Sequence, residues 1–194
     1  HPIPSEKKFK SSESKHYNKK ESDLVLFFGL IRKYKGLETL INSMKYNRNF
    51  KLLIVGEFYD NKKKYLNLIE KLNLKTRINI VDRFIRNEEI RNYFIRSKAV
   101  ILPYKTASQS GVISLCYLFD KPIVVSNLDG LTSYVNSDNS GIVFNNTSID
   151  LANAIDIVLD RKNNYFYSEN IKKNKNKYSW EKFADEFLRF TLNI

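Results

Sequence analysis

The chain has 194 residues, of which 42% are hydrophobic and 13% aromatic, and its formal net charge is +12. This composition supplies enough apolar material for one buried core and excludes wholesale disorder. No apolar run approaches the roughly 20 residues that a membrane span requires, and no signal-peptide apolar core is visible near the first residue. The single cysteine, Cys116, excludes an internal disulfide and a zinc cluster, so we expect a cytoplasmic protein.

Positive charge is concentrated in two segments that flank the apolar part of the chain. Residues 1–20 have a net charge of +4, and residues 161–177 have a net charge of +5. Neither segment contains a nucleic-acid-binding motif of the RNP or zinc-finger type, so no nucleic-acid partner is expected. Solvated tails are the simplest interpretation of this charge. The alternative is weak attraction to an anionic membrane surface, which would place the protein peripherally at the inner face of the membrane.

The hydrophobic pattern changes after the first twenty-two residues. Residues 1–22 are polar, charged and without periodicity, which is typical of a linker or arm. In chain order, the pattern then predicts strands at 24–28, 52–55, 78–81, 99–102, 123–126 and 141–144, and helices at 37–44, 65–72, 90–94, 111–119, 148–159 and 179–192. Ser148 is the predicted capping residue of the helix that it begins.

Strands of continuous β-branched and leucine character that alternate with helices predict a parallel sheet covered on both faces. We therefore expect a doubly wound α/β domain over residues 23–160. A basic segment and a terminal amphipathic helix follow over residues 161–194. Such sheets bind ligands beyond the carboxyl ends of their strands, where loops lead into helices. Candidate functional residues should therefore lie in these loops.

The loop after the first strand has the sequence GLIRKYKG, residues 29–36. Two glycines bracket Arg32, Lys33 and Lys35, and a predicted helix follows. Flexible backbone with cations at the carboxyl end of a strand suits a phosphate or diphosphate.

A second loop, PYKTASQSGV, leads from the strand at 99–102 into the helix that begins near Gly111. The first turn of a helix offers free amides and about half a positive charge. Gly111 would let an anion approach the backbone, and Ser108, Gln109 and Ser110 add side-chain donors. The loop has no acid to repel a phosphate. Two such loops at one edge predict a single anionic ligand, most simply a nucleoside diphosphate.

Other nucleotide-binding folds lack support in this sequence. No GxxxxGK[ST] motif is present, which excludes a P-loop NTPase, and no GxGxxG follows the first strand, which argues against a dinucleotide site. A phosphoacceptor receiver would need an acidic cluster after the first strand, where this chain is basic.

Five segments taken in order identify a family resemblance. They are FFGLIRKYKGLETLI, LLIVGE, RINIVDRFIRNEEIRNYFIRSKAVILPY, SQSGV and KPIVVSNLDGL. Together they resemble the C-terminal, Rossmann-like donor-binding domain of the retaining GT-B glycosyltransferases, in the large group typified by bacterial sugar transferases of polysaccharide assembly. The match runs from about residue 24 to 159, and the tail YSWEKFADEFL resembles the closing helix of that family.

The resemblance implies roles for particular positions. Arg32 and Lys35 match the arginine and lysine that hold the donor diphosphate, although the usual arginine after the first glycine of the loop is Leu30 here. The diphosphate site would consist of Gly29, Arg32, Lys35, Ser108, Gln109, Ser110, Gly111 and Val112. The segment expected near the nucleobase, ribose or sugar comprises Arg83, Phe84 and Ile85, with Glu57 orienting its loop or meeting the sugar.

The chain departs from the family at two glutamates that usually contact the sugar and the ribose. The matching positions are Ala107 and Leu115, so no catalytic residue is assigned. The resemblance further implies a nucleotide-sugar donor, a saccharide or lipid-linked acceptor, no metal or other cofactor, and an N-terminal GT-B domain that this chain does not include. A non-catalytic nucleotide-binding or interaction module of the same fold remains the alternative.

Overall fold

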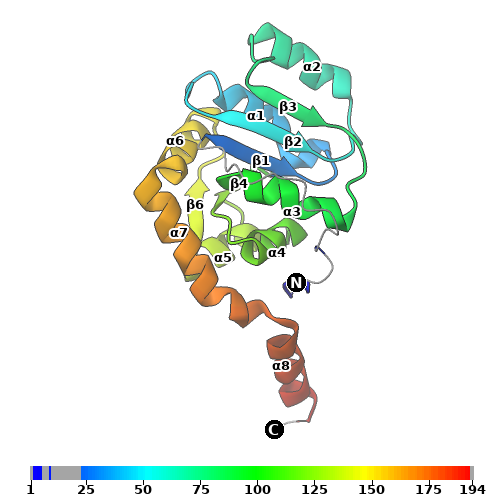
Figure 1. Cartoon of the computed structure of the whole chain (residues 1–194), viewed down its shortest axis with the longest axis vertical. Helices are drawn as coiled ribbons and strands as arrows, with labels where there is room; N and C mark the ends of the chain where they lie inside the picture. The colour runs from blue at the N-terminus through cyan, green and yellow to red at the C-terminus, as the bar shows by residue number, and fades with distance from the viewer. Residues whose placement is uncertain (1, 6–8, 10–22, 193–194) are drawn as a thin grey trace.

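A computed structural model describes residues 2–5, 9 and 23–192 of the chain. Six parallel strands form one sheet in the order β3-β2-β1-β4-β5-β6 (Figure 1). The strands are β1 Leu24–Phe28, β2 Lys51–Val55, β3 Ile78–Val81, β4 Ala99–Leu102, β5 Ile123–Ser126 and β6 Gly141–Phe144. This order, with the crossover between β3 and β4, confirms the predicted doubly wound α/β, Rossmann-like sheet.

The burial of each strand follows its place in the sheet. Every residue of β1, β4 and β5 is buried, whereas the edge strand β3 is partly exposed. Continuous apolar runs are stable only where both faces of a strand are covered, which is why the predicted strands coincide closely with the observed ones.

Eight α-helices and two short 3₁₀ turns accompany the sheet in the described part of the chain. The helices are α1 Leu37–Ser43, α2 Lys62–Lys71, α3 Asn87–Arg96, α4 Gly111–Leu118, α5 Asp129–Asp138, α6 Ser148–Leu159, α7 Arg161–Asn174 and α8 Trp180–Leu192, and the turns are η2 Lys33–Lys35 and η3 Lys175–Tyr178.

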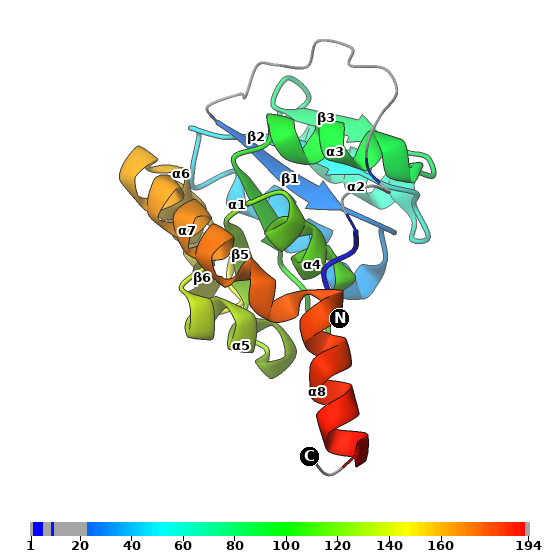
Figure 2. The ribbon, with the colours of Figure 1, turned by 60° about the horizontal axis from the view of Figure 1, so that its bottom comes forward.

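The helices divide between the two faces of the sheet. One apolar core is formed with α3, α4 and α5 and includes Ile171 of α7. The other core is formed with α1, α2 and α6. In Figure 2, α3 and α4 lie over one face of the sheet, and α1 lies behind the opposite face. Both faces of the sheet are therefore covered, as the sequence predicts.

The sequence analysis missed two helices and one cap. The segments of α5 and α7 have few apolar residues, and each packs along one narrow side. The N-cap of α6 is Thr147, whose side chain accepts from the Asp150 amide at 3.0 Å, and not Ser148. The Ser148 hydroxyl instead donates to the Thr39 carbonyl at 3.1 Å, which joins α6 to α1.

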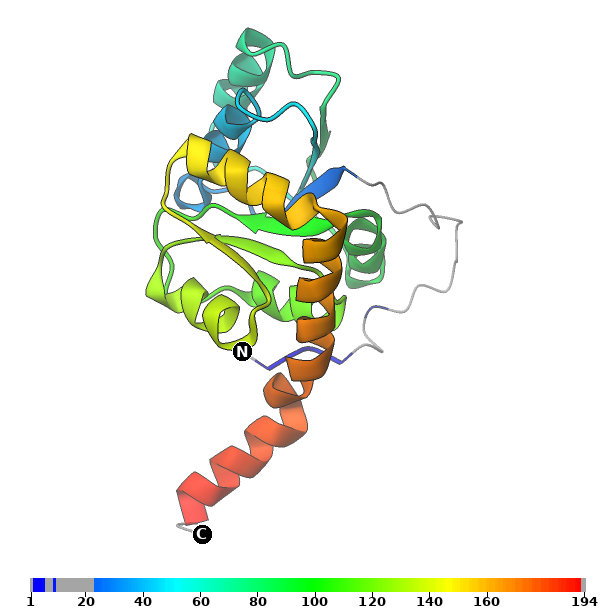
Figure 3. The same cartoon turned by 90° about the vertical axis from the view of Figure 1, so that its left-hand side faces the viewer.

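The described N-terminal residues lie beside the domain and contact the end of η3. The amide of Ile3, in the segment predicted to be a linker or arm, donates to the Tyr178 carbonyl at 2.7 Å. Phe9 is buried, and its ring packs edge-on against Phe119. The rest of the predicted arm lies outside the described residues. Beyond Tyr178, α8 extends away from the sheet (Figures 1 and 3), and its role as a closing helix stays a prediction.

Candidate functional site

Three loops meet at the carboxyl edge of the sheet because their strands are neighbours. They follow β2, β1 and β4, which lie side by side in the sheet. The Ile31 amide donates to the Glu57 carbonyl at 2.8 Å, and the Tyr59 amide donates to the Ile31 carbonyl at 2.9 Å. The Lys105 amide donates to the Tyr34 carbonyl at 2.7 Å. Backbone hydrogen bonds thus join the three loops.

Two glycines determine the backbone conformation of the loop after β1. Gly29 has a φ of +100°, and a Cβ added to it would lie 2.8 Å from the Lys35 ammonium nitrogen. Gly36 has a φ of +70°, and its Cβ would lie 1.8 Å from the Pro103 carbonyl oxygen. A side chain at either position would be strained by the positive φ, and at Gly36 it would also collide with backbone. The glycines that bracket the cations in the sequence are therefore required by the fold of the loop.

Lys35 is a buried cation, with an exposed fraction of 8%. Its ammonium lies beside Gly29 and 5.5 Å from the centroid of the Tyr104 ring. Burial, followed by the charge of Arg32, lowers the pKa of Lys35 to about 8. Within the part of the chain that the structure describes, no carboxylate forms an ion pair with this ammonium. A desolvated cation without a counter-anion is costly to the fold, which is typical of a site shaped for an anionic ligand.

The N-terminus of α4 lies next to this ammonium. Val112 Cγ2 is 3.9 Å from the position that a Cβ on Gly29 would take. Ser110 is the N-cap of α4: its hydroxyl oxygen accepts from the Val112 amide at 3.3 Å and lies 3.3 Å from the Tyr104 hydroxyl. The N-terminus of α4, which carries partial positive charge, therefore lies close to Lys35.

Gly111 is exposed, and a Cβ added to it would have no protein atom within 4 Å. Ser108 and Gln109 are also exposed in the loop before α4. The space in front of this helix end is therefore open, and contacts of Ser108, Gln109 and Gly111 with a ligand stay a prediction.

Arg32 occupies a different position from Lys35. Its side chain is exposed, and its guanidinium lies 5.4 Å from the centroid of the Tyr59 ring. With Lys33, Tyr34, Tyr59, Lys105 and Thr106, it lines a surface groove of about 570 Å³. The two residues predicted to bind the diphosphate thus belong to the same loop, but Lys35 is buried and Arg32 is exposed.

In the loop after β3, a guanidinium is already paired. Arg83 donates from Nη1 to Oε2 of Glu89 at 2.9 Å, and its Nη2 donates to the other carboxylate oxygen and to the Tyr93 hydroxyl. The hydrogen bond from Arg83 lowers the pKa of Glu89 to about 2. Glu89 also accepts from the Arg86 amide at 3.2 Å, which caps α3. The side chain of Arg83 therefore stabilises its own loop.

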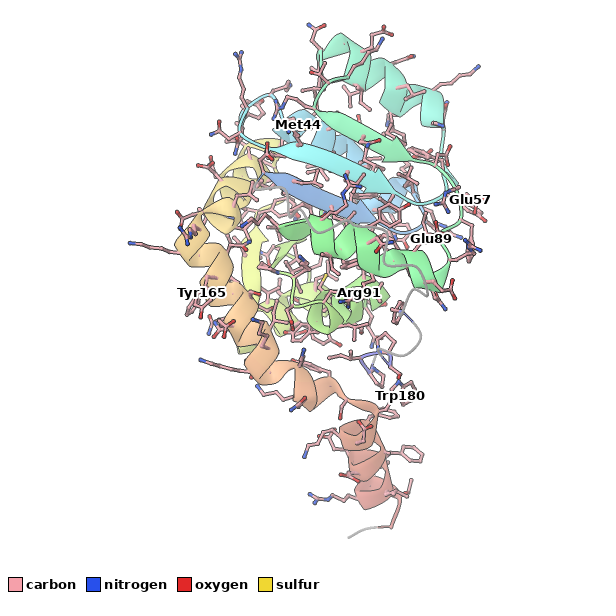
Figure 4. All side chains as sticks on the ribbon, viewed as in Figure 1. Met44, Glu57, Glu89, Arg91, Tyr165 and Trp180 are labelled. Carbon is pink, nitrogen blue, oxygen red and sulfur yellow. The ribbon has the colours of Figure 1, made fainter. Side chains whose placement is uncertain are left out.

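The remaining predicted residues differ in exposure. Ile85 is buried in the core, Phe84 is 71% exposed, and Glu57 is half-buried. Figure 4 shows Glu57 and Glu89 at the same end of the sheet, where β1, β2 and β3 end. Contacts of Glu57, Phe84 and Ile85 with a ligand stay predictions.

Neither position matched to a family glutamate can supply a carboxylate at this site. Ala107 and Leu115 both pack against the core that covers α4. Sequence reasoning missed Tyr104, which is buried and contacts both Lys35 and Ser110. The sequence signal that could have identified it is a tyrosine two residues after the end of a predicted strand, at the start of a loop expected to bind an anion.

In the described segments, no group of three or more histidine, cysteine or acidic side chains could hold a metal ion. The same residues include no helix long and apolar enough to cross a bilayer. The expectation of a site without metal or cofactor stays a prediction.

Comparison with known proteins gives a family match. The family model described as "Glycosyl transferases group 1" matches residues 8–178. The comparison with curated protein sequences produced no significant match.

Solved structures share the fold at low sequence identity. Sucrose-phosphate synthase from Thermosynechococcus elongatus aligns with a TM-score of 0.78 and 22% identity, over 88% of this chain and 45% of that one. Anabaena Alr3699/HepE in complex with UDP aligns with a TM-score of 0.78 and 18% identity, over 88% and 49%. The C-terminal domain of a group 1 glycosyl transferase family protein (LpcC) from Francisella tularensis aligns with a TM-score of 0.72 and 16% identity, over 91% and 99%.

The chain thus spans about half the length of the first two structures but nearly all of the isolated C-terminal domain. At these identities the likeness shows the fold, which is that of the C-terminal half of a GT-B architecture.

Proposed function

The chain belongs to the group 1 glycosyl transferases, and we propose that it is the donor-binding half of an enzyme that transfers a sugar from a nucleoside diphosphate to an acceptor. The observation that carries this proposal is the buried Lys35 ammonium at the N-terminus of α4, with no counter-anion in the described structure. A diphosphate would supply the missing negative charge. Charge-assisted hydrogen bonds from an ammonium and from helix amides are the strong type for such a ligand.

The same groups would assist the reaction. As the bond between the sugar and the phosphate oxygen breaks, negative charge accumulates on the leaving diphosphate. Lys35 and the α4 amides would stabilise that charge, and Arg32 would add a more exposed contact. This is electrostatic catalysis by groups that are already in place before the bond breaks. It needs no covalent intermediate with this chain.

The donor is proposed to be a nucleotide hexose. Anabaena HepE, whose fold this chain shares, has been solved with UDP and with UDP-glucose, which supports a nucleoside-diphosphate sugar here. Transfer with retention of the anomeric configuration is supported by the resemblance in sequence, which includes the SQSGV segment.

The acceptor is proposed to be a saccharide or lipid-linked molecule of bacterial polysaccharide or glycoconjugate assembly. WaaG, of which this chain covers 54%, is a glycosyltransferase involved in lipopolysaccharide biosynthesis. The acceptor site would lie on an N-terminal domain that this chain does not include, and the enzyme would act in the cytoplasm. A weak peripheral contact with the inner face of the membrane would bring it to such acceptors.

One observation favours a second candidate function. Ala107 and Leu115 leave the sugar and ribose without the carboxylates that the family uses. A module that binds the nucleotide without turning it over would have the same diphosphate site. Sugar transfer by this chain combined with an N-terminal GT-B domain, measured with UDP-, GDP- and ADP-sugars, separates the two functions.

Calorimetry on the 194-residue chain tests the diphosphate site itself. UDP, GDP or ADP should bind more tightly than the matching nucleoside, because the diphosphate makes the charged contacts. Gly111→Val should weaken diphosphate binding and leave the melting temperature unchanged, since the side chain enters open space. Gly111→Ala is the matched control with a smaller side chain. Equal affinities for nucleotide and nucleoside would overturn the proposed site.

A further inference from the structure

The outer face of α7 is rich in cations that the donor site does not use. Arg161, Lys162, Lys172 and Lys173 are exposed along this helix. We define the α7 surface by these residues together with three neighbours, Lys98, Tyr165 and Phe166. In Figure 3, α7 (orange) lies across the side of the molecule that faces the viewer.

Part of this surface is hollowed. Lys98, Arg161, Lys162 and Lys172 contribute to a groove of about 610 Å³, with Tyr165 on its wall. Buried Asn164 fixes the helix beside the groove, because its side-chain amide donates to the carbonyls of Lys98 and Val158. The cations therefore line one groove on a helix that these hydrogen bonds hold in place.

Among the described residues, most of these cations have no acidic partner. Glu169 pairs with Lys172 at 2.6 Å, and Asp160 accepts from backbone amides as the N-cap of α7. In the described part of the chain, five cations thus face three acids on or beside this surface, because Asp120 also lies close enough to Lys172 to act on its charge. Lys175 and Lys177, which follow in η3, are instead paired with Asp120 and Asp138. The net positive charge is therefore concentrated on the α7 surface.

Aromatic and aliphatic side chains lie among these charges. Tyr165 is 69% exposed, Phe166 is 53% exposed, and Ile157 of the preceding helix is 47% exposed. Lysine and arginine side chains interspersed with aromatic rings suit the headgroup level of a bilayer, where the rings enter the apolar boundary and the cations meet phosphates.

A second exposed apolar face, on α8, has a different charge balance. On α8, Trp180, Phe183, Phe187 and Phe190 are exposed. The charged residues of that helix are Glu181, Lys182, Asp185, Glu186 and Arg189, with a net charge of −1. An anionic surface would not attract it. Charge complementarity therefore favours α7 over α8 as the helix that contacts an anionic membrane.

We propose that the α7 surface binds anionic phospholipid membranes, with phosphate headgroups at the basic groove and Tyr165 and Phe166 in the interface. The surface lies on the opposite side of the molecule from the end to which β1, β2 and β3 point (Figures 1 and 4). Failure of vesicle binding would therefore leave the proposed diphosphate site intact, and failure of nucleotide binding would leave the membrane surface intact.

Co-sedimentation of the 194-residue chain with vesicles tests this surface. Vesicles of equal parts phosphatidylglycerol and phosphatidylcholine should bind the chain, and pure phosphatidylcholine should bind it at least tenfold more weakly. The variant Lys162→Gln/Lys173→Gln/Tyr165→Ser should lose tenfold or more of this binding, since each lysine near an anionic surface contributes about fivefold. Binding should weaken between low salt and about 0.15 M salt.

The matched control makes the same changes on α2. Lys63→Gln/Lys71→Gln/Leu66→Ser alters exposed residues of that helix and removes the same net charge. It should lower vesicle binding by no more than about twofold, which is the effect of net charge alone. Equal losses in the two variants would overturn the proposal. So would equal binding to neutral vesicles, loss of binding in Phe187→Ser of α8, or tight, salt-resistant binding of duplex DNA or RNA. Circular dichroism melts and nucleotide affinity should be unchanged in the α7 variant.

Discussion

Lys35 and Arg83 are both cations in loops that follow strands at the carboxyl edge, but their surroundings differ. Lys35 is buried beside Gly29 and Tyr104, and burial lowers its pKa to about 8. Arg83 is paired with Glu89, and the hydrogen bond raises the pKa of its guanidinium. The fold satisfies Arg83 with an internal partner and leaves Lys35 without one in the described structure. A cation in a loop therefore indicates a ligand when burial disfavours its charge and no acid compensates it.

The largest effect is expected for Lys35→Met. Loss of a charged contact should lower affinity for nucleoside diphosphates by tenfold to a hundredfold, from about 1.5–3 kcal/mol. The same change should raise the melting temperature, because a desolvated charge is replaced by an apolar side chain of similar size. Calorimetry and thermal unfolding measure both. Lys33→Met, an exposed lysine of the same loop, is the control. Unchanged affinity with a lower melting temperature would make Lys35 a structural residue.

The pH dependence of binding sharpens the comparison. Below about pH 8 the Lys35 ammonium is protonated and attracts the diphosphate, and above that pH it loses its charge. Affinity should therefore fall between pH 7 and 9.5, approaching tenfold per pH unit above pH 8. The fall should vanish in Lys35→Met and persist in Arg83→Gln. A flat profile in the unmodified chain would contradict the assignment.

Stability should change with pH in the opposite direction. The unfolded chain holds the Lys35 proton with the ordinary pKa of 10.5, and the folded chain holds it with a pKa of about 8. Between these values the unfolded state binds more protons, so this residue makes the fold more stable as pH rises. Comparing denaturant unfolding of the unmodified chain with that of Lys35→Met isolates the contribution.

A smaller loss is expected for Arg32→Gln. Its guanidinium is exposed beside Tyr59, so solvent screens its contact with a diphosphate more than it screens Lys35. We expect affinity to fall roughly threefold to tenfold. Glu57→Gln, in the neighbouring loop, should change it by less than twofold, because a carboxylate is not a phosphate ligand. If Glu57→Gln is the more damaging of the two, the diphosphate lies in a different loop.

A smaller effect on binding than that of Arg32→Gln is expected for Arg83→Gln. The Arg83–Glu89 pair is partly exposed, so its loss should change the unfolding free energy by no more than about 1 kcal/mol. Nucleotide affinity should fall by less than threefold, through a less rigid loop. Glu89→Gln should match it in nucleotide affinity, because it removes the same pair, and should lower the unfolding free energy at least as much, because Glu89 also interacts with Arg86. A tenfold loss of affinity in Arg83→Gln alone would show that this guanidinium contacts the ligand directly.

Prediction from sequence succeeded where one residue pattern had one structural solution. Continuous apolar runs such as 24–28 and 99–102 had to be central strands, and the structure has them there. The helix α7 was missed because only Asn164 and Ile171 of its residues are buried, so its periodicity is weak. The cap at Thr147 was missed because Ser148 is an equally good capping residue, and its hydroxyl was taken by Thr39 of another helix.

The amino-acid sequence by itself determined the doubly wound sheet, the placing of glycines and cations in loops at its carboxyl edge, and the absence of acids from the loop before α4. These are local properties, set by hydrophobic period and by residue type next to a strand. Only the tertiary structure decided which cation of these loops is buried without an acidic partner among the described residues. The surroundings of Lys35 come from Gly29, Tyr104 and Val112, which are brought together by the adjacency of β1 and β4. Burial and pairing depend on such distant contacts, and so does the chemistry of a charged side chain.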